Sequence, residues 1–443
     1  MVNGCKVAVA AAIGNFLEWF DFALYGFLAV TIGRLFFPSG NPTNSLLAAL
    51  AVFGVAFLVR PLGGLVIGAF GDRVGRRAAL SLSILLMGIC TTAIALLPTY
   101  QAVGVAAPIL LVALRCGQGF SAGGEYAGAA AYLIEYAPNA RRGLWSSVVS
   151  ATAAMGVAAG GVVTLVLTAW ISDAQLEAWG WRLPFLLAAP LSIVGLYVRL
   201  KLEDTPVYRE LQQTEQVASA PLRGAGRHSR RGIALVFAST AVAGLGFYYL
   251  ATYVVTFLTV TVGLVRREAL LIAVAGLLVY SALCPLAGKI GDRIGRRRTM
   301  LVGTVGLAVV AIPCFMLIST GNVVLAVTAI VVFAVFEALA NVMLGVLLVE
   351  LFPAALRITG SAIGFNLAQA LVGGPGPLVA AALAAAIALS FAPALYIAGV
   401  AALASIVLAR FLPETLGTSL GPEKPAPPAG SRVAAADLEV AGA

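Results

Sequence analysis

Charged residues are scarce in this sequence. Asp, Glu, Lys and Arg make up only 11% of its 443 residues, against roughly a quarter in soluble domains. Hydrophobic residues make up 61%, and the mean hydropathy is +0.99. A chain with so little charge lacks the polar surface of a soluble domain, so we expect most of it to lie in a lipid bilayer.

Histidine and cysteine are also sparse. His228 is the only histidine, which excludes a buried histidine base and a histidine-rich metal cluster. The five cysteines are scattered through apolar segments without CxxC spacing. We therefore expect no disulfide and no metal site.

Long apolar stretches are abundant. A helix needs about 20 residues to cross roughly 30 Å of hydrocarbon. We predict twelve spans near that length or longer, at 8–34, 45–70, 78–98, 103–135, 144–170, 183–200, 232–260, 269–288, 299–318, 322–350, 358–386 and 391–411. The first is longer than the apolar region of a signal peptide and contains Trp19 and Asp21, so we expect it to be retained as a helix.

The net charge of +9 is distributed unevenly. Arginines and lysines cluster in alternate loops, at 73–77, 141–142, 201–231 and 289–298, and the intervening loops hold few. By the positive-inside rule the basic loops are cytoplasmic, and twelve spans then put both termini in the cytoplasm. This distribution accounts for the positive charge without a nucleic-acid partner.

Two segments of the sequence are repeated. Gly68-Ala-Phe-Gly-Asp72-Arg73-Val-Gly75-Arg76-Arg77 follows the second span and returns after the eighth as Gly288-Lys-Ile-Gly-Asp292-Arg293-Ile-Gly295-Arg296-Arg297. Glu135, Pro138 and Arg142 after the fourth span have the same spacing as Glu350, Pro353 and Arg357 after the tenth. Such a repeat predicts two six-helix halves. We divide the chain into an N-terminal bundle (1–200), a cytoplasmic linker (201–231), a C-terminal bundle (232–411) and a disordered cytoplasmic tail (412–443).

The repeated loops resemble GxxxD(R/K)xGR(R/K), the signature of the major facilitator superfamily between helices 2 and 3 and between helices 8 and 9. Four further segments resemble its metabolite:proton symporter family, namely Gly14-Asn-Phe-Leu-Glu18-Trp-Phe-Asp21-Phe, Phe57-Leu-Val-Arg60-Pro61-Leu-Gly-Gly, Gln118-Gly-Phe-Ser-Ala-Gly-Gly-Glu125-Tyr and Trp179-Gly-Trp-Arg182-Leu-Pro-Phe. That family includes proline/betaine, α-ketoglutarate, citrate and shikimate importers. The resemblance covers about residues 14–415.

The resemblance implies an all-α membrane protein with 12 transmembrane helices in two pseudo-symmetric halves. It implies a monomer in a bacterial inner membrane that imports a small carboxylate-bearing metabolite, a zwitterion or an organic acid, together with protons by alternating access. The proton gradient takes the place of a cofactor. The first half is most similar to the proline/betaine member, but the Pro/Ala/Gly-rich segment 417–443 is not the long coiled coil of that member, so we expect no osmotic sensing through such a coil.

The resemblance also implies that the repeated loops form a cytoplasmic gate. Asp72 and Asp292 can accept hydrogen bonds from helix N-terminal amides or pair with Arg142 and Arg357, and Glu135 and Glu350 offer partners for the loop arginines. The alternative is that these charges only fix topology. The predicted gate residues are Gly68, Asp72, Arg73, Gly75, Arg76, Glu135, Arg142, Gly288, Asp292, Arg293, Gly295, Arg296, Glu350 and Arg357.

Ionisable residues inside a span are candidates for the transport site, because a charge there is costly unless it faces a cavity or a partner. Six lie deep in the predicted spans: Glu18, Asp21, Arg60, Arg115, Glu125 and Glu337. A rise of about 1.5 Å per residue puts Asp21 and Arg115 both near the midplane, where they can meet. The acids outnumber the arginines four to two, which favours a zwitterion over a tricarboxylate.

We predict proton coupling at Asp21, with Glu18 or Glu125 as a helper, and binding of the substrate carboxylate by Arg115 and Arg60. The full predicted substrate-binding set is Tyr25, Arg60, Arg115, Gln118, Tyr248, Tyr249, Glu337, Asn341 and Asn366. Tyrosines in a span often serve only in packing, and Glu337 is not part of the family pattern.

Two other classes of function are open alternatives. A drug/proton antiporter of the same fold usually carries a glycine-rich motif ending in Gly-Pro in its fifth helix, and residues 144–169 contain no proline. A transporter-like sensor or a membrane enzyme needs an output domain or catalytic residues. Gly119-Phe-Ser121-Ala-Gly123 matches the GxSxG pattern of hydrolases but lies within an apolar span, so we do not expect an enzyme.

Overall fold

The computed structural model describes residues 4–387 and 389–421, and in these residues the regular structure is entirely helical. Eleven helices within the described residues are long and apolar enough to cross a membrane. α6 (Ala106–Tyr136), of 31 residues, is a further long helix, and it carries buried polar residues such as Arg115 and Gln118. Together they give the twelve long helices that the sequence predicts, and the all-α fold class is confirmed.

The N-terminal half holds the first six long helices. Their bounds, with the short elements between them, are α1 (Gly4–Phe27), α2 (Ala29–Phe36), α3 (Pro42–Val74), α4 (Arg76–Leu96), α5 (Tyr100–Val103), α6, η1 (Asn139–Arg141), α7 (Arg142–Trp170), α8 (Asp173–Gln175), η2 (Leu176–Gly180) and α9 (Arg182–Leu200). The predicted first span is interrupted at Leu28, where α1 ends and α2 begins.

The C-terminal half holds the other six. Its elements are α12 (Arg230–Tyr248), η3 (Tyr249–Tyr253), α13 (Val254–Thr256), η4 (Phe257–Thr261), α14 (Arg266–Ile294), α15 (Arg296–Ile318), α16 (Val323–Glu350), η5 (Ala354–Leu356), α17 (Arg357–Ala368), η6 (Gln369–Gly373), α18 (Gly376–Ala386) and α19 (Ala392–Phe411). The seventh and eleventh spans are not regular α-helices, because π-helical turns interrupt both. Such turns often occur at functional sites.

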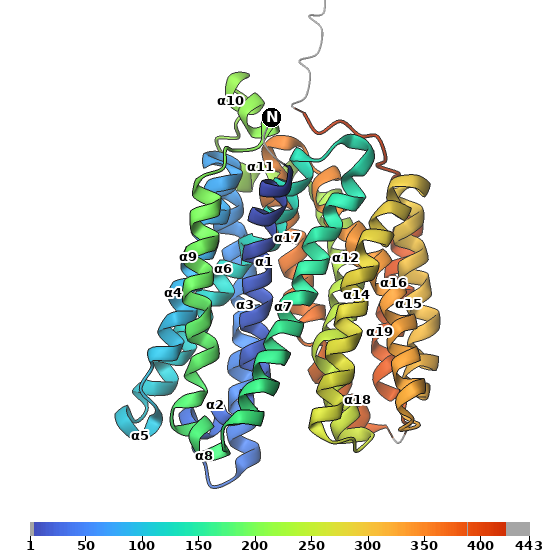
Figure 1. The fold of residues 1–443 in the computed structure, drawn as a ribbon. Coiled ribbons are helices and arrows are strands. Elements are labelled where there is room, and N and C mark those ends of the chain that lie inside the picture. The colour runs from blue at the N-terminus through green and yellow to red at the C-terminus, as the bar shows by residue number, and fades with distance from the viewer. Residues whose placement is uncertain (1–3, 388, 422–443) are drawn as a thin grey trace, which may run out of the picture.

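The two halves lie side by side with their long helices roughly parallel (Figure 1). α7 of the first half packs against α14 of the second, and α3 packs against α17. Glycines permit this close approach, since a Cβ atom at Gly288 would overlap the backbone of Gly143. α10 (Pro206–Gln213) and α11 (Pro221–His228) of the linker lie at the upper end in Figure 1, which also carries the arginine-rich loops.

The predicted disorder of the tail is wrong for residues 412–421. This segment, called here the C-terminal strap, runs across the arginine-rich end without helical structure and turns at residues 415–418 (Figure 1). Thr415 and Leu420 are buried, and the backbone oxygens of Thr418 and Leu420 accept hydrogen bonds from Arg142 and Arg357. Residues 422–443, the greater part of the Pro/Ala/Gly-rich segment, lie outside the described part of the chain.

Candidate functional site

The aspartates of the two repeated loops bind helix N-termini in the opposite half of the molecule. Asp72 at the end of α3 accepts hydrogen bonds from the backbone N–H groups of Ile358 and Thr359 in the first turn of α17, at 3.2 and 2.8 Å. A helix N-terminus presents free N–H groups and a partial positive charge, which favour a carboxylate.

The second loop repeats this arrangement with the halves exchanged. Asp292 at the end of α14 accepts from the N–H groups of Gly143 and Leu144 in the first turn of α7, at 2.8 and 2.9 Å. Of the two kinds of partner considered from the sequence, the helix N-terminal amides are the ones observed. The alternative prediction, that the aspartates pair with Arg142 and Arg357, is wrong, because their ion pairs are with Arg76 and Arg296.

The loop arginines and glutamates form a charged layer next to these aspartates. Arg357 lies 2.6 Å from Glu135 and Arg142 lies 3.1 Å from Glu350, so each pair joins the two halves. Arg76 contacts both Asp72 and Glu135, at 3.0 and 3.4 Å.

Arg296 repeats these contacts in the second half, with Asp292 at 2.7 Å and Glu350 at 3.6 Å. Arg73 and Arg293, predicted as members of the gate, are exposed and take no part in the ion pairs of the described residues. We exclude both from the charged layer.

Two acidic residues of this layer do not follow from the repeat that we read in the sequence. Asp204 accepts from the N–H of Arg76 at the start of α4, and Glu414 accepts from the N–H of Arg296 at the start of α15. Each is followed by a threonine whose hydroxyl donates to Glu135 or Glu350, so Asp204-Thr205 and Glu414-Thr415 form a third repeated pair. An acidic residue followed by threonine, after both the sixth and the twelfth spans, is the sequence pattern that could have predicted these contacts.

The hydrogen bonds of Asp204 and Glu414 to the starts of α4 and α15 require the glycines of the repeated loops. Gly75 and Gly295 have φ values of +127° and +103°, where a side chain is strained. A Cβ at Gly75 would overlap Asp204, and one at Gly295 would overlap Glu414. Burial raises the pKa of Asp204 above its usual range, and the hydrogen bonds from the backbone N–H groups of Thr205 and the start of α4 partly oppose that shift.

Within the membrane-spanning region, Asp21 of α1 and Arg115 of α6 meet. Arg115 Nη1 lies 3.4 Å from Asp21 Oδ2, and Gln118 Nε2 donates to the same oxygen at 2.7 Å. The Arg115 guanidinium lies 4.2 Å from the centroid of the Tyr25 ring, while the Tyr25 hydroxyl donates to the Ala49 backbone oxygen. Tyr25 therefore faces the arginine with its ring and uses its hydroxyl in packing.

A second ion pair lies beside the first. Arg60 of α3 contacts Glu18 of α1 at 2.7 Å, and its Nε donates to Asn366 of α17 at 3.4 Å. Arg60 and Arg115 both lie within 5.6 Å of the Phe22 ring centroid, so the two guanidinium groups share one aromatic wall. All four charged side chains of these two pairs are buried.

Glu125, which we predict as a helper of Asp21 in proton coupling, forms an ion pair with Arg199. Both of its oxygens accept from Arg199 at the end of α9, which also donates to the backbone oxygens of Ala10 and Leu80. Gly14 leaves the room for this pair, because a Cβ there would overlap it. Arg199 was missed because it falls in the last two residues of a predicted span, where arginines usually reach the membrane surface.

A small pocket lies where the halves meet, and aromatic rings form much of its wall. Its lining residues are Trp19, Tyr126, Ala153, Gly244, Phe247, Asn341, Leu344, Phe365 and Gln369. Trp19 and Phe247 pack edge to face with centroids 4.7 Å apart, and Tyr126 stacks on Phe365 at 4.6 Å. Tyr248 contacts Trp19 and Phe57, so it also lies at the boundary between the halves.

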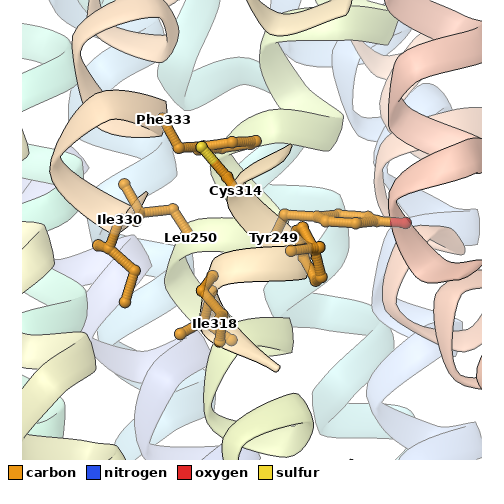
Figure 2. Close-up of a pocket in the computed structure, with 8 residues that line it drawn as sticks. Tyr249, Leu250, Cys314, Ile318, Ile330 and Phe333 are labelled. Carbon is orange, nitrogen blue, oxygen red and sulfur yellow. The ribbon is translucent and has the colours of Figure 1, made fainter. Parts of the chain in front are cut away.

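Tyr249 lies elsewhere. It lines an apolar pocket inside the second half, with neighbours that include Cys314 and Phe333 (Figure 2), and its hydroxyl donates to the Pro393 backbone oxygen at 2.8 Å. The structure separates it from Tyr248 because adjacent residues on a helix point about 100° apart. We therefore leave Tyr249 out of the candidate site.

Comparison with known proteins identifies the class. A sequence model of the Major Facilitator Superfamily matches residues 11–377 and 236–436. This chain belongs to the Major Facilitator Superfamily, and it is a multi-pass membrane protein.

Its relatives are named transporters, not enzymes. The chain is 36% identical over 433 residues to the glycine betaine/proline/ectoine/pipecolic acid transporter OusA of Dickeya dadantii, covering 95% of this chain and 85% of the relative. It is 37% identical over 388 residues to the proline/betaine transporter of Escherichia coli K12, covering 85% of this chain and 77% of the relative. The proton:xylose symporter XylE bound to 6-bromo-6-deoxy-D-glucose shares the fold, with a TM-score of 0.79 at 18% identity over 94% of this chain and 97% of XylE.

Proposed function

We propose that this protein is a proton-coupled symporter of a bacterial inner membrane that imports a small zwitterionic carboxylate by alternating access. The observation that carries the proposal is the buried contact between Asp21 and Arg115. In this contact, the Asp21 carboxyl group can take up a proton, and the Arg115 guanidinium group can bind a carboxylate. The named solutes of the relatives, betaine, proline, ectoine and pipecolic acid, are all zwitterions with a carboxylate.

Coupling follows from competition for Arg115. While Asp21 is ionised it neutralises Arg115, because an unpaired charge at that depth is costly. Protonation of Asp21 removes the counter-charge, and Arg115, whose Nε and Nη2 have no hydrogen-bond partner among the described residues, is then free to bind a substrate carboxylate in its bidentate fork. Proton and substrate therefore favour the same state, and linkage makes their binding cooperative.

The aromatic pocket supports a zwitterion as the substrate. Trp19, Phe247 and Tyr126 offer ring faces that attract an alkylammonium group by cation–π contact. Arg60, close to Phe57 and Phe365, offers a second guanidinium to the carboxylate end. A tricarboxylate would meet the buried acids Glu18 and Glu337 with no matching excess of cations.

The charged layer supports a cytoplasmic gate. Its ion pairs join the halves at the arginine-rich end, which the positive-inside rule assigns to the cytoplasm together with both termini. Substrate release inward requires these contacts to break, while the opposite ends of the helices close. The two halves supply all of the contacts from one chain, which supports function as a monomer.

Uptake into proteoliposomes tests the proposal. Labelled betaine, proline, α-ketoglutarate, citrate and shikimate are offered to the reconstituted protein with the interior alkaline by about one pH unit. We expect accumulation of betaine or proline, by about tenfold for each proton carried with the substrate, and none when the gradient is collapsed. Accumulation of a drug-like cation with the interior acid instead would favour the antiporter.

A further inference from the structure

Glu337 of α16 differs from the other buried acids in the membrane-spanning region. Glu18, Asp21 and Glu125 each contact an arginine. Glu337 is fully buried, and no lysine or arginine among the described residues forms an ion pair with it. Its Oε1 accepts from Asn341 Nδ2 at 3.2 Å, and its Oε2 has no hydrogen-bond partner within the described chain.

Among the residues that the structure describes, none with a positive charge forms an ion pair with Glu337. The titratable groups that face it are the Tyr280 phenol and the Cys284 thiol of α14 and the Tyr126 phenol of α6. α12 presents only backbone at this point, because a Cβ at Gly246 would overlap Glu337 Oε2. An ionised carboxylate here would be an uncompensated charge in an apolar interior, whereas a protonated one is neutral.

The hydrogen bonds of Asn341 connect Glu337 to the other half of the protein. Asn341 Oδ1 accepts from the hydroxyls of Tyr126 on α6 and Ser150 on α7, both at 3.0 Å. Its Nδ2 donates to Glu337 and to the Ala243 backbone oxygen of α12. Asn341 also lines the aromatic pocket. A change of charge at Glu337 therefore acts on the contact between α16 and two helices of the first half.

We propose that Glu337 is a second proton-binding site of the transport cycle, separate from Asp21. A proton from water adds to Oε2, which forms the O–H bond and removes the negative charge, and the halves can then pack around the occupied pocket. When the opposite face opens, water reaches Glu337, the O–H bond breaks and the proton leaves on that side. Two protons then accompany each substrate, one on Asp21 and one on Glu337. This inference rests on the proposed function.

The proton-to-substrate ratio tests it. The ratio is obtained in proteoliposomes from the size of the pH gradient that just balances a known gradient of labelled betaine or proline. We expect a ratio of two for the wild type and one for Glu337→Gln, so that accumulation in a gradient of about one pH unit falls from about 100-fold to about tenfold. Tyr280→Phe is the matched control, since it removes a neighbouring hydroxyl without removing a carboxyl, and it should keep the ratio of two.

Three results would overturn the inference. A ratio of one in both the wild type and Glu337→Gln means that Asp21 alone carries the proton. A ratio of two retained by Glu337→Gln means that the second proton binds elsewhere. A wild type that does not respond to the pH gradient at all refutes the proposed function as a whole, so the two failures are distinguishable.

Infrared spectroscopy provides a measurement that does not depend on transport. The spectrum of the wild type should contain the C=O stretch of a protonated carboxylic acid that is missing from Glu337→Gln and present in Tyr280→Phe. Counterflow exchange of labelled substrate by Glu337→Gln establishes that the variant is folded. An exchanging variant whose spectrum keeps the whole of the wild-type acid band would contradict proton binding at Glu337.

Discussion

Arg142 of α7 and Glu350 of α16 form an ion pair of 3.1 Å, although they belong to different halves of the protein. The repeat reverses the direction, since Arg357 of the second half binds Glu135 of the first at 2.6 Å. Each half therefore supplies one arginine and one glutamate to the two ion pairs that join the halves. When the halves part, Glu135 and Glu350 keep Arg76 and Arg296 of their own halves, whereas Arg142 and Arg357 lose their carboxylate partners and need water in their place.

The loop aspartates should control the equilibrium between gate states without being essential for folding. In Asp72→Asn, the charge-assisted bonds to the first turn of α17 weaken, and a hydrogen bond to a charged group contributes about 1.5–3 kcal/mol. Reversing a population from 1:99 to 99:1 takes about 5.5 kcal/mol, so we expect a partial shift to the cytoplasm-open state.

Distances between spin labels at the exposed positions Arg141 and Arg298 measure that shift. We expect a longer-distance population in Asp72→Asn and in Asp292→Asn, slower transport, and a substrate affinity within a few-fold of the wild type. If both variants transport at the wild-type rate with unchanged distances, the aspartates only fix topology.

Arg115 should bind substrate through its planar fork and not only through its charge. Arg115→Lys keeps the positive charge against Asp21 but loses the bidentate geometry, so we expect weaker binding by about tenfold. Arg115→Ala leaves Asp21 without a counter-charge and should bind no substrate. Equilibrium binding of labelled substrate to the purified variants decides this, and wild-type affinity in Arg115→Ala would remove Arg115 from the site.

The C-terminal strap should stabilise the closed gate. Truncation after Leu416 removes the Thr418 and Leu420 oxygens that accept from Arg142 and Arg357, so we expect the cytoplasm-open population to grow. Truncation after Gly421 is the matched control, because it keeps both acceptors. The same spin-label pair reports on both truncations, and equal distance distributions would show that the strap has no role in gating.

Labelling of single cysteines tests the topology. Gly40→Cys and Val265→Cys should react with a membrane-impermeant reagent from the outside of intact cells. Ala140→Cys and Glu215→Cys, at the opposite end of the helices, should react only from the inside. All four positions are exposed, and labelling of Glu215→Cys from outside would contradict the cytoplasmic linker.

Sequence patterns predicted the number of helices, the two halves and the contact of Asp21 with Arg115, because the repeat and the helix rise determine them. The sequence patterns did not predict which residue each of the other buried charged side chains contacts. The spans are apolar on all sides, so periodicity does not distinguish a residue that faces lipid from one that faces a helix. Tyr248 and Tyr249 illustrate this, as does Arg199, which turns inward to Glu125 at a depth where arginines commonly face the surface.

The most direct test of the coupling compares wild type and Asp21→Asn in two assays on the same proteoliposomes. The asparagine resembles the protonated aspartate, so Arg115 stays free for the substrate and counterflow exchange should persist near the wild-type rate. Accumulation in a pH gradient of about one unit should fall by about tenfold, because Asp21 no longer carries a proton. Accumulation equal to that of the wild type would contradict the account.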